Sequence, residues 1–328
     1  MRTRISVVLV LRWAALSIVL SGGAAAQTAS PDTPPPKFPR AAAFMPQTAP
    51  DSARQQETMV RIPGGTYTIG SPAQHPFADR QAMPEHKVAI KAFRLDRTEV
   101  TNTQFAEFLN ALPVKPTGTA LGGKVSAANI PSGFRAVLLE FSSRPSPYTM
   151  IDLDDAEALI GVRGGRFVPN PGAENHPVTE TTWAGALAYC NWRGARLPTE
   201  AEWEAAARGP KGRTFPWGEA MPTTELAVIN RPSGDIIAVG SRPKGATPEG
   251  LLDMAGSLLE WTSSLLRPYP YRADDGRENL ALPGERAVRG GNYVFDDAPE
   301  RLTGWNRTVS WRNPATGHRQ IGVRCAAD

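Results

Sequence analysis

The sequence has few of the side chains that hold transition metals. It contains two cysteines and four histidines among 328 residues. Zinc and iron sites need several nitrogen or sulfur ligands at close spacing, and no two histidines have that spacing. We therefore expect neither zinc nor iron, and expect hydrogen-bonded turn positions for the second and third of the four histidines: His75, His86, His176 and His318.

Excess charge is also missing from most of the chain. The formal net charge is +4, and Arg2, Arg4 and Arg12 belong to the first 26 residues, which contain no acidic residue. Without these three charges +4 becomes +1. A nearly neutral domain has no bulk electrostatic attraction for nucleic acid or anionic lipid. We therefore expect no nucleic-acid partner, and a small molecule or a peptide as the ligand.

Only the start of the chain has an apolar run of any length, and residues 1–26 resemble an export signal. A positively charged start precedes the apolar run, and Ala24-Ala25-Ala26 offers small residues for cleavage. Arg12 interrupts the run, and the uninterrupted part is short for a membrane span, although an uncleaved anchor is the alternative. We predict cleavage near Ala26, no membrane insertion afterwards, and a periplasmic or secreted monomer.

The remainder divides into a linker and one domain. Residues 27–57 are rich in proline, alanine, serine and glutamine, with too little apolar surface to offset the entropy of ordering. Residues 58–328 suffice for one large core. The chain holds 30 glycines and 31 prolines, which favours turns and short strands over long elements. We predict a loop-rich α/β (α+β) domain.

The stretch 182–218 predicts two consecutive helices. Thr182 can cap the first, whose apolar residues recur at helical spacing up to Cys190, and Arg193-Gly194 can end it. Thr199 and Glu202 form a capping box for the second, which Gly209-Pro210 ends. The buried stripe expected on the second helix is Trp203, Ala206 and Ala207.

Shorter elements are expected on both sides of this pair. A second capping box, Thr101 with Gln104, predicts a helix that buries Phe105, Phe108 and Leu109. Alternating apolar residues around paired glycines predict hairpins of 59–62 with 67–69 and of 160–163 with 166–168. Further short strands are expected at 88–90, 93–95, 287–289 and 321–325. The rest of the chain after residue 218 is expected to be mostly loop.

The central stretch contains sequence motifs that are specific enough to indicate a protein family. It contains AYCNW, RLPTEAEWEAAARG and FPWG, and other motifs follow in order across residues 59–328, among them MVRIPGG, TEVTN, GLLDMAG, RGGNY and GVRCA. These motifs resemble the formylglycine-generating enzyme family, also called the sulfatase-modifying factor family. The resemblance implies that family's fold, which is related to the C-type lectin fold, with the tandem helices as its scaffold.

The resemblance also assigns the two cysteines. Cys190 and Cys325 match a structural disulfide of the family, and an even cysteine count in an exported protein supports the pairing, with two unpaired buried thiols as the alternative. Active members hold copper with two more cysteines after the Gly-Gly motif, where this chain has Phe295 and roughly Glu300. Neither side chain binds Cu(I), which requires soft sulfur ligands. A related branch holds iron with histidines of an added helical bundle, which this sequence lacks.

Calcium is left open by the resemblance. The family binds it with carboxylate, amide and carbonyl oxygens, as a hard cation requires. One family segment keeps Glu260 here but has Ser257 in place of an asparagine, which weakens the site. Asn230 and Asp235 lie in the segment of another site. These four residues are the expected calcium ligands.

The last third of the chain carries polar and aromatic side chains that can line a cleft. We assign catalytic roles to Glu260, Tyr293 and Arg312, and ligand binding to Asn292, Glu300, Trp305 and His318. Three roles stay open for Glu260: calcium ligand, buried partner of an arginine, or acid/base. Arg289 and Arg324 are expected to pair with acidic residues.

The function follows mainly by exclusion. Some family members without the copper cysteines are periplasmic oxidases. We therefore expect an exported, oxidase-like accessory or maturation factor, without copper, that acts on a secreted small molecule or peptide. A non-catalytic ligand- or protein-binding module on the same fold is the alternative, and a true formylglycine-generating oxidase is a third, weaker one.

Overall fold

The computed structural model describes residues 59–111, 150–153, 157–307 and 317–328. The predicted export signal and linker lie outside these ranges. The strands are β1 (Val60–Ile62), β2 (Gly65–Ile69), β3 (His86–Ile90), β4 (Phe93–Leu95), β5 (Ile160–Arg163), β6 (Arg166–Pro169), β7 (Leu259–Leu265), β8 (Arg286–Arg289), β9 (Ile321–Gly322) and β10 (Ala326–Ala327). The helices are α2 (Asn102–Ala111), α4 (Trp183–Trp192) and α5 (Glu200–Arg208), with single 3-10 turns η2 (Arg80–Ala82), η3 (Pro243–Gly245) and η4 (Pro299–Arg301).

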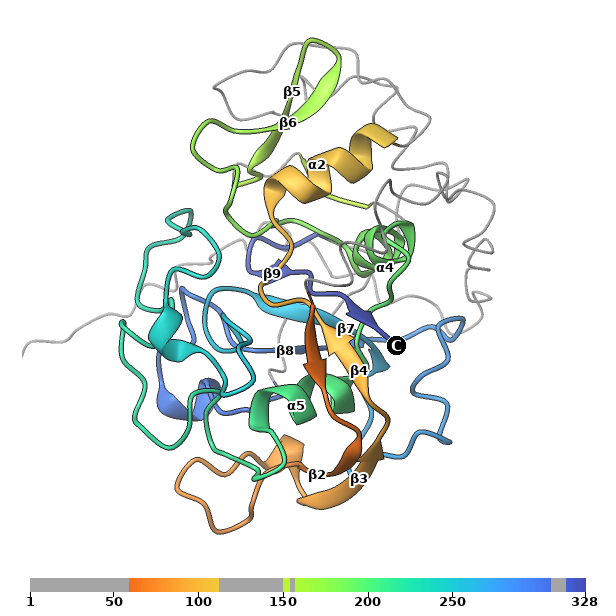
Figure 1. Ribbon diagram of the computed structural model, residues 1–328, viewed down its shortest axis with the longest axis vertical. Coiled ribbons are helices and arrows are strands. Elements are labelled where there is room, and N and C mark those ends of the chain that lie inside the picture. Colours follow the sequence, from red (N-terminus) through yellow and green to blue (C-terminus); the bar gives the residue numbers. More distant parts are fainter. Residues whose placement is uncertain (1–58, 112–149, 154–156, 308–316) are drawn as a thin grey trace, which may run out of the picture. The chain divides into compact units, whose positions relative to one another are not determined.

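The strands form small sheets rather than one large one. The described residues contain two three-stranded sheets, β1-β4-β10 and β8-β7-β9, and two two-stranded ones, β2-β3 and β5-β6. Figure 1 shows α2 and the β5–β6 hairpin at one end, β2–β3 and α5 at the other, and the three-stranded sheets between them. The loop-rich α/β class is confirmed. No helix in the described ranges is long and apolar enough to cross a membrane.

The tandem helices form as the capping residues predict. The Thr182 hydroxyl accepts a hydrogen bond from Gly185 N at the start of α4, and Gly194 turns left-handed after it with φ 72°. Thr199 and Glu202 complete the capping box of α5. Helix α4 packs in one hydrophobic cluster with α2 and β7, and α5 packs in a second with β2 and β4. The two helices therefore anchor both halves of the core.

Two strand predictions are wrong. Strands β1 and β2 do not pair with each other, because β1 pairs with β4 and β2 pairs with β3. The chain bends at Gly64, where a Cβ would lie 2.8 Å from Ala92 N, and passes from the β1-β4-β10 sheet to the β2-β3 sheet. Of the strand expected at 321–325, only Ile321–Gly322 forms a strand, β9, which joins β7, whereas β10 begins after the predicted range and joins β4.

No strand was predicted from the sequence for β7, the longest strand in the described ranges. It lies between antiparallel β8 and parallel β9, and all seven of its residues are buried. A strand covered on both faces lacks the alternation of apolar and polar residues that marks a half-exposed strand. The segment LEWTSSL therefore resembles a loop in sequence although it is the centre of its sheet.

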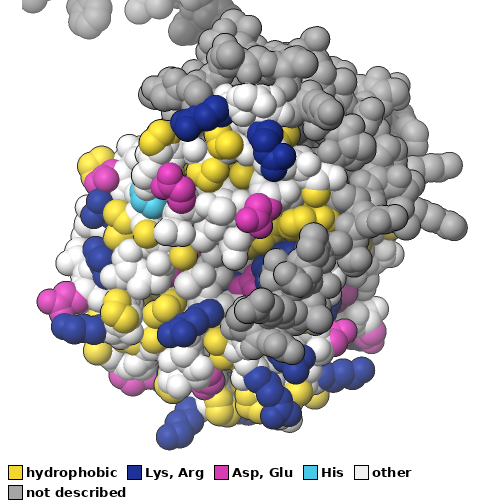
Figure 2. Space-filling model, turned by 45° about the horizontal axis from the view of Figure 1, so that its top comes forward, with side chains coloured by type: hydrophobic (Ala, Val, Ile, Leu, Met, Phe, Trp, Pro, Cys, Tyr) yellow, Lys and Arg dark blue, Asp and Glu magenta, His cyan; other side chains and the backbone are white. Residues whose placement is uncertain are grey.

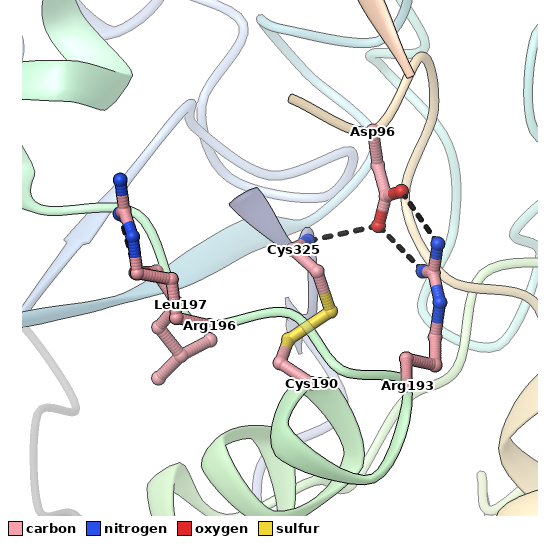
Figure 3. Close-up of a disulfide and its surroundings, with 6 residues drawn as sticks. All are labelled: Asp96, Cys190, Arg193, Arg196, Leu197 and Cys325. Carbon is pink, nitrogen blue, oxygen red and sulfur yellow. Dashed lines mark hydrogen bonds and ion pairs between the residues drawn. A yellow bond between two sulfur atoms is a disulfide. The ribbon is translucent and has the colours of Figure 1, made fainter. Parts of the chain in front are cut away.

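The predicted disulfide is present. Cys190 of α4 is bonded to Cys325, which precedes β10 (Figure 3). Asp96 lies beside it and accepts from Cys325 N at 2.9 Å while holding Arg193 through both carboxylate oxygens. The cross-link and this ion pair together fasten the end of α4 to the C-terminal segment.

Candidate functional site

The site is built on the loop that follows β8, residues 290–302, which we call the Asn292 loop. Gly290 and Gly291 open it with φ 111° and 77°. A Cβ on Gly291 would lie 3.0 Å from the Arg301 carbonyl oxygen, so the close approach of the two ends of the loop favours glycine. The two glycines of the RGGNY motif therefore allow the two ends of the loop to lie close together.

Asn292 organises the turn that comes next. Its side-chain oxygen accepts from Val294 N at 3.0 Å and Phe295 N at 2.9 Å. Its own backbone N–H and its side-chain amide both donate to one carboxylate oxygen of Asp296. A side chain that closes a turn in this way fixes the backbone without help from a sheet. Asn292, predicted as a ligand-binding residue, thus shapes the loop from a buried position.

The turn presents Phe295 to solvent. Its side chain is 69 % exposed, the highest value among the large hydrophobic residues of the described ranges that are exposed. Asp297 and Glu300, also exposed, follow it on the same loop. Phe295 and Glu300 occupy the positions at which the resemblance expects copper-binding thiols. Both cysteines of the chain are in the disulfide, so the loop carries no sulfur ligand.

Of the other predicted catalytic and ligand-binding residues, those that the structure describes are buried or partly buried. Tyr293 is buried, and its hydroxyl oxygen accepts from Gly234 N at 3.0 Å. Burial raises the pKa of this tyrosine. Trp305 is buried and donates to the Phe77 carbonyl. His318 is partly buried and accepts from Gln320 N. Arg312 lies outside the described residues.

Glu260 is the buried partner of an arginine, one of the three roles that the sequence left open. It lies in β7 with no exposed surface. Arg324 contacts both of its carboxylate oxygens, at 2.7 to 3.0 Å, and Trp203 Nε1 donates to one of them at 2.6 Å. Arg289 and Arg324 both pair with acidic residues, as expected. A carboxylate enclosed in this way cannot reach a ligand while the core stays closed.

The four predicted calcium ligands belong to two expected sites, and the carboxylate of each site already has an arginine partner. Glu260 is held by Arg324, and Asp235 pairs with Arg231 at 2.8 Å. Ser257 is buried, whereas Asn230 is exposed. A calcium site needs several oxygens directed at one point. In the ranges that the structure covers, no group of three or more His, Cys, Asp or Glu could hold a metal ion.

The acidic members of a buried polar cluster beside α5 were not predicted from the sequence. Arg289 bonds Glu200 and Glu204 of α5 at 3.1 and 2.9 Å, Arg307 bonds Glu200 at 2.7 Å, and Tyr269 donates to Glu204 at 3.1 Å. Burial opposes ionisation of Glu200, but Arg307 and Arg289 outweigh it and lower its pKa. The signal for this cluster was the recurrence of charge at Glu200, Glu204 and Arg208, four residues apart on a helix that also has a capping box.

Figure 2 shows charged side chains of both signs on the face that it draws. On the face drawn in Figure 2, lysine and arginine alternate with aspartate and glutamate, and small hydrophobic areas lie between them. This distribution agrees with the small net charge of the chain.

Comparison with known proteins finds a matching family model and similar sequences. The family model of the sulfatase-modifying factor enzyme 1-like domain matches residues 45–328. A formylglycine-generating enzyme of Mycobacterium tuberculosis is 32 % identical, over 82 % of this chain and 97 % of that protein. Hercynine oxygenase of Mycolicibacterium smegmatis is 33 % identical, over 83 % of this chain and 61 % of that protein.

A solved structure agrees in fold. PvdO from Pseudomonas aeruginosa matches with a TM-score of 0.55 and 23 % identity, over 82 % of this chain and 94 % of that one. The family match covers most of the chain, including the tandem helices, β7 and the Asn292 loop. The chain belongs to the sulfatase-modifying factor enzyme 1-like family.

Proposed function

We propose that this family member is an exported, oxidase-like maturation factor that acts on a secreted small molecule or peptide without copper held by cysteines. Family membership, with relatives named as formylglycine-generating enzymes and as an oxygenase, supports an oxidase-like accessory role. Export rests on the signal-like segment 1–26. The substrate binds at the Asn292 loop, where the family places its chemistry.

The observation that carries the proposal is the exposed Phe295 on a turn that Asn292 holds by hydrogen bonds. Two backbone N–H groups are held by Asn292, so Phe295 is presented in a defined position. A residue whose backbone is already fixed loses less entropy when a ligand covers its side chain. The acidic neighbours Asp297 and Glu300 add polar groups at its edge. The loop thus has the features of a binding surface rather than of a packed core.

A non-catalytic binding module on the same fold is the second candidate. The observation that favours it is that both cysteines and two of the four histidines, residue types that can hold a redox metal, are engaged elsewhere. Both cysteines are in the disulfide. Both ring nitrogens of His75 and of His86 make hydrogen bonds within the protein. A binder needs only the surface around Phe295.

The two candidates differ in what the native host secretes. The gene is deleted, and secreted compounds and peptides are compared by untargeted mass spectrometry. We expect the deletion to replace a mature compound by a precursor that has two more hydrogen atoms or one oxygen atom fewer. Complementation with the wild-type gene should restore the mature compound.

Matched variants then connect the activity with the loop. Phe295→Asp should fail to restore the mature compound although the protein reaches wild-type levels. Leu280→Asp is the control, because Leu280 is also exposed, at 40 %, but lies in the segment between β7 and β8. An unchanged set of secreted masses after deletion would refute the maturation role and leave the binding module. Full activity of Phe295→Asp would refute the Asn292 loop as the site.

A further inference from the structure

The tip of the Asn292 loop contains a buried acidic residue, Asp296. It is 6 % exposed, although its two neighbours in the chain, Phe295 and Asp297, are exposed. One of its carboxylate oxygens accepts from the backbone N–H of Asn292 at 3.0 Å and also from the Asn292 side-chain amide. The carboxylate is therefore turned inward, toward Asn292, and not toward solvent.

Asn292 and Asp296 support each other across the turn. The side-chain oxygen of Asn292 accepts from the N–H groups of Val294 and Phe295, while Asp296 reaches back to the N–H of Asn292. The arrangement resembles a helix capping box, in which one side chain accepts from the backbone ahead and a later side chain bonds back to the first residue. Here the same logic closes a turn that lies outside the sheets.

The two ends of the Asn292 amide have different kinds of partner. Oδ1 faces two backbone donors, and Nδ2 faces a carboxylate oxygen, which accepts. Rotation of the amide by half a turn would direct Nδ2 at the N–H groups of Val294 and Phe295, and Oδ1 at Asp296. Donor would then face donor and acceptor would face acceptor. Asp296 therefore favours the one amide orientation in which the turn is closed.

Other contacts anchor the loop as a whole. Tyr293 N donates to the Ser257 carbonyl at 2.9 Å, and the Val294 side chain packs against the hydrophobic cluster that contains Tyr293. Phe295 is 69 % exposed and has far less packing, so its position depends more on the hydrogen bond to Asn292. Loss of the Asp296 acceptor should therefore loosen Phe295 without unfolding the domain.

We propose that Asp296 is a positioning residue of the substrate site: it orients the Asn292 amide, and Asn292 in turn holds Phe295 where the substrate covers it. The inference rests on the proposed function, which assigns the substrate to the surface around Phe295. Asp296 itself does not touch the substrate, because it is buried beneath the turn.

The role requires an acceptor oxygen and not a charge. Burial raises the pKa of Asp296, while the Asn292 donors and the charge of Arg301 act in the opposite direction. The oxygen that faces Asn292 can accept whether or not the other oxygen carries a proton. An amide oxygen in the same place would accept equally, so asparagine should replace Asp296.

Two variants of nearly the same shape test this role. Asp296→Asn keeps an acceptor oxygen for Asn292, whereas Asp296→Leu removes it. Hydrogen exchange of single amides is measured on the full mature protein at one pH. In Asp296→Leu we expect the protection factors of the Asn292 and Phe295 amides to fall roughly tenfold, because the hydrogen bonds that close the turn are lost or weakened. Asp296→Asn should keep both close to the wild-type values.

A distant amide shows that the variants remain folded. The Phe167 amide donates to the Asn110 side chain at 2.9 Å, far along the chain from the Asn292 loop. It should keep its protection factor in Asp296→Leu and in Asp296→Asn. A fall confined to the Asn292 loop is the result expected of a local positioning role.

Complementation of the gene deletion connects the turn with the substrate. Asp296→Leu should leave the precursor in the culture medium, whereas Asp296→Asn should restore the mature compound. Asp274→Leu is the matched control, because Asp274 is also an acidic loop residue but is exposed on the segment between β7 and β8. It should restore the mature compound.

The possible results distinguish this inference from the proposed function. Unchanged protection of the Phe295 amide in Asp296→Leu would overturn the inference. So would full maturation by Asp296→Leu where Phe295→Asp fails, and the proposed function would then stand. Full maturation by Phe295→Asp would remove the Asn292 loop as the site and the role of Asp296 toward the substrate with it.

Discussion

Removal of the Cys190–Cys325 cross-link should destabilise the domain by about 5 kcal/mol. The two cysteines are 135 residues apart, and closing a loop of that length removes about 5 kcal/mol of chain entropy from the unfolded state on the entropic model. Both residues are fully buried, so the loss of two sulfur atoms in Cys190→Ala/Cys325→Ala adds a small cavity term of roughly 1 kcal/mol.

Urea unfolding followed by fluorescence of the buried tryptophans measures this difference. The wild-type protein in reductant serves as a matched control, because it loses the cross-link without the cavity. Both should unfold at lower urea than the oxidised protein, and the melting temperature should fall by roughly 10 °C or more. A loss below about 1 kcal/mol would refute the entropic reasoning. The Asp96–Arg193 pair would then be the main fastening of α4.

Three more predictions concern the buried charges and export. Glu260→Gln should cost about 3–5 kcal/mol in urea unfolding, because Arg324 stays buried without its partner; a loss below about 1 kcal/mol would contradict this. Burial opposes ionisation of Glu200, but Arg307 and Arg289 outweigh it and lower its pKa in the folded protein. The ionised Glu200 therefore stabilises the fold above its unfolded-state pKa of about 4.3, and this stabilisation is lost as the pH falls through its folded-state pKa. Glu200→Gln should therefore flatten the acid limb of the stability curve, and an unchanged limb would count against the ion-pair account. Mass spectrometry of protein from the native host should find a mature N-terminus near residue 27, whereas an intact Met1 would reject cleavage.

The sequence predicted those elements whose signals are local. Capping residues are read from three or four neighbouring positions, so both boundaries of α4 and α5 could be placed, from Thr182 and Gly194 for α4 and from Thr199 and Gly209 for α5. Strand pairing depends on distant partners. Nothing near β1 shows that it pairs with β4, and nothing within β7 shows that β8 and β9 cover its edges.

The candidate site was predicted less well for a related reason. Polar residues at motif positions were assigned to a cleft, but Glu260 and Tyr293 lie inside the molecule and hold the scaffold together. Whether a polar side chain is buried with a partner or exposed to a ligand depends on what packs over it. Phe295 was noticed only as a missing thiol, because its exposure follows from the turn that Asn292 builds.

Metal analysis of the purified mature protein tests the central claim, that this family member works without copper held by cysteines. Plasma mass spectrometry of the protein, with a count of free thiols in denaturant, gives both quantities in one preparation. The account predicts copper far below one equivalent and no free thiol, since both cysteines are in the disulfide. One equivalent of tightly bound copper would contradict the account.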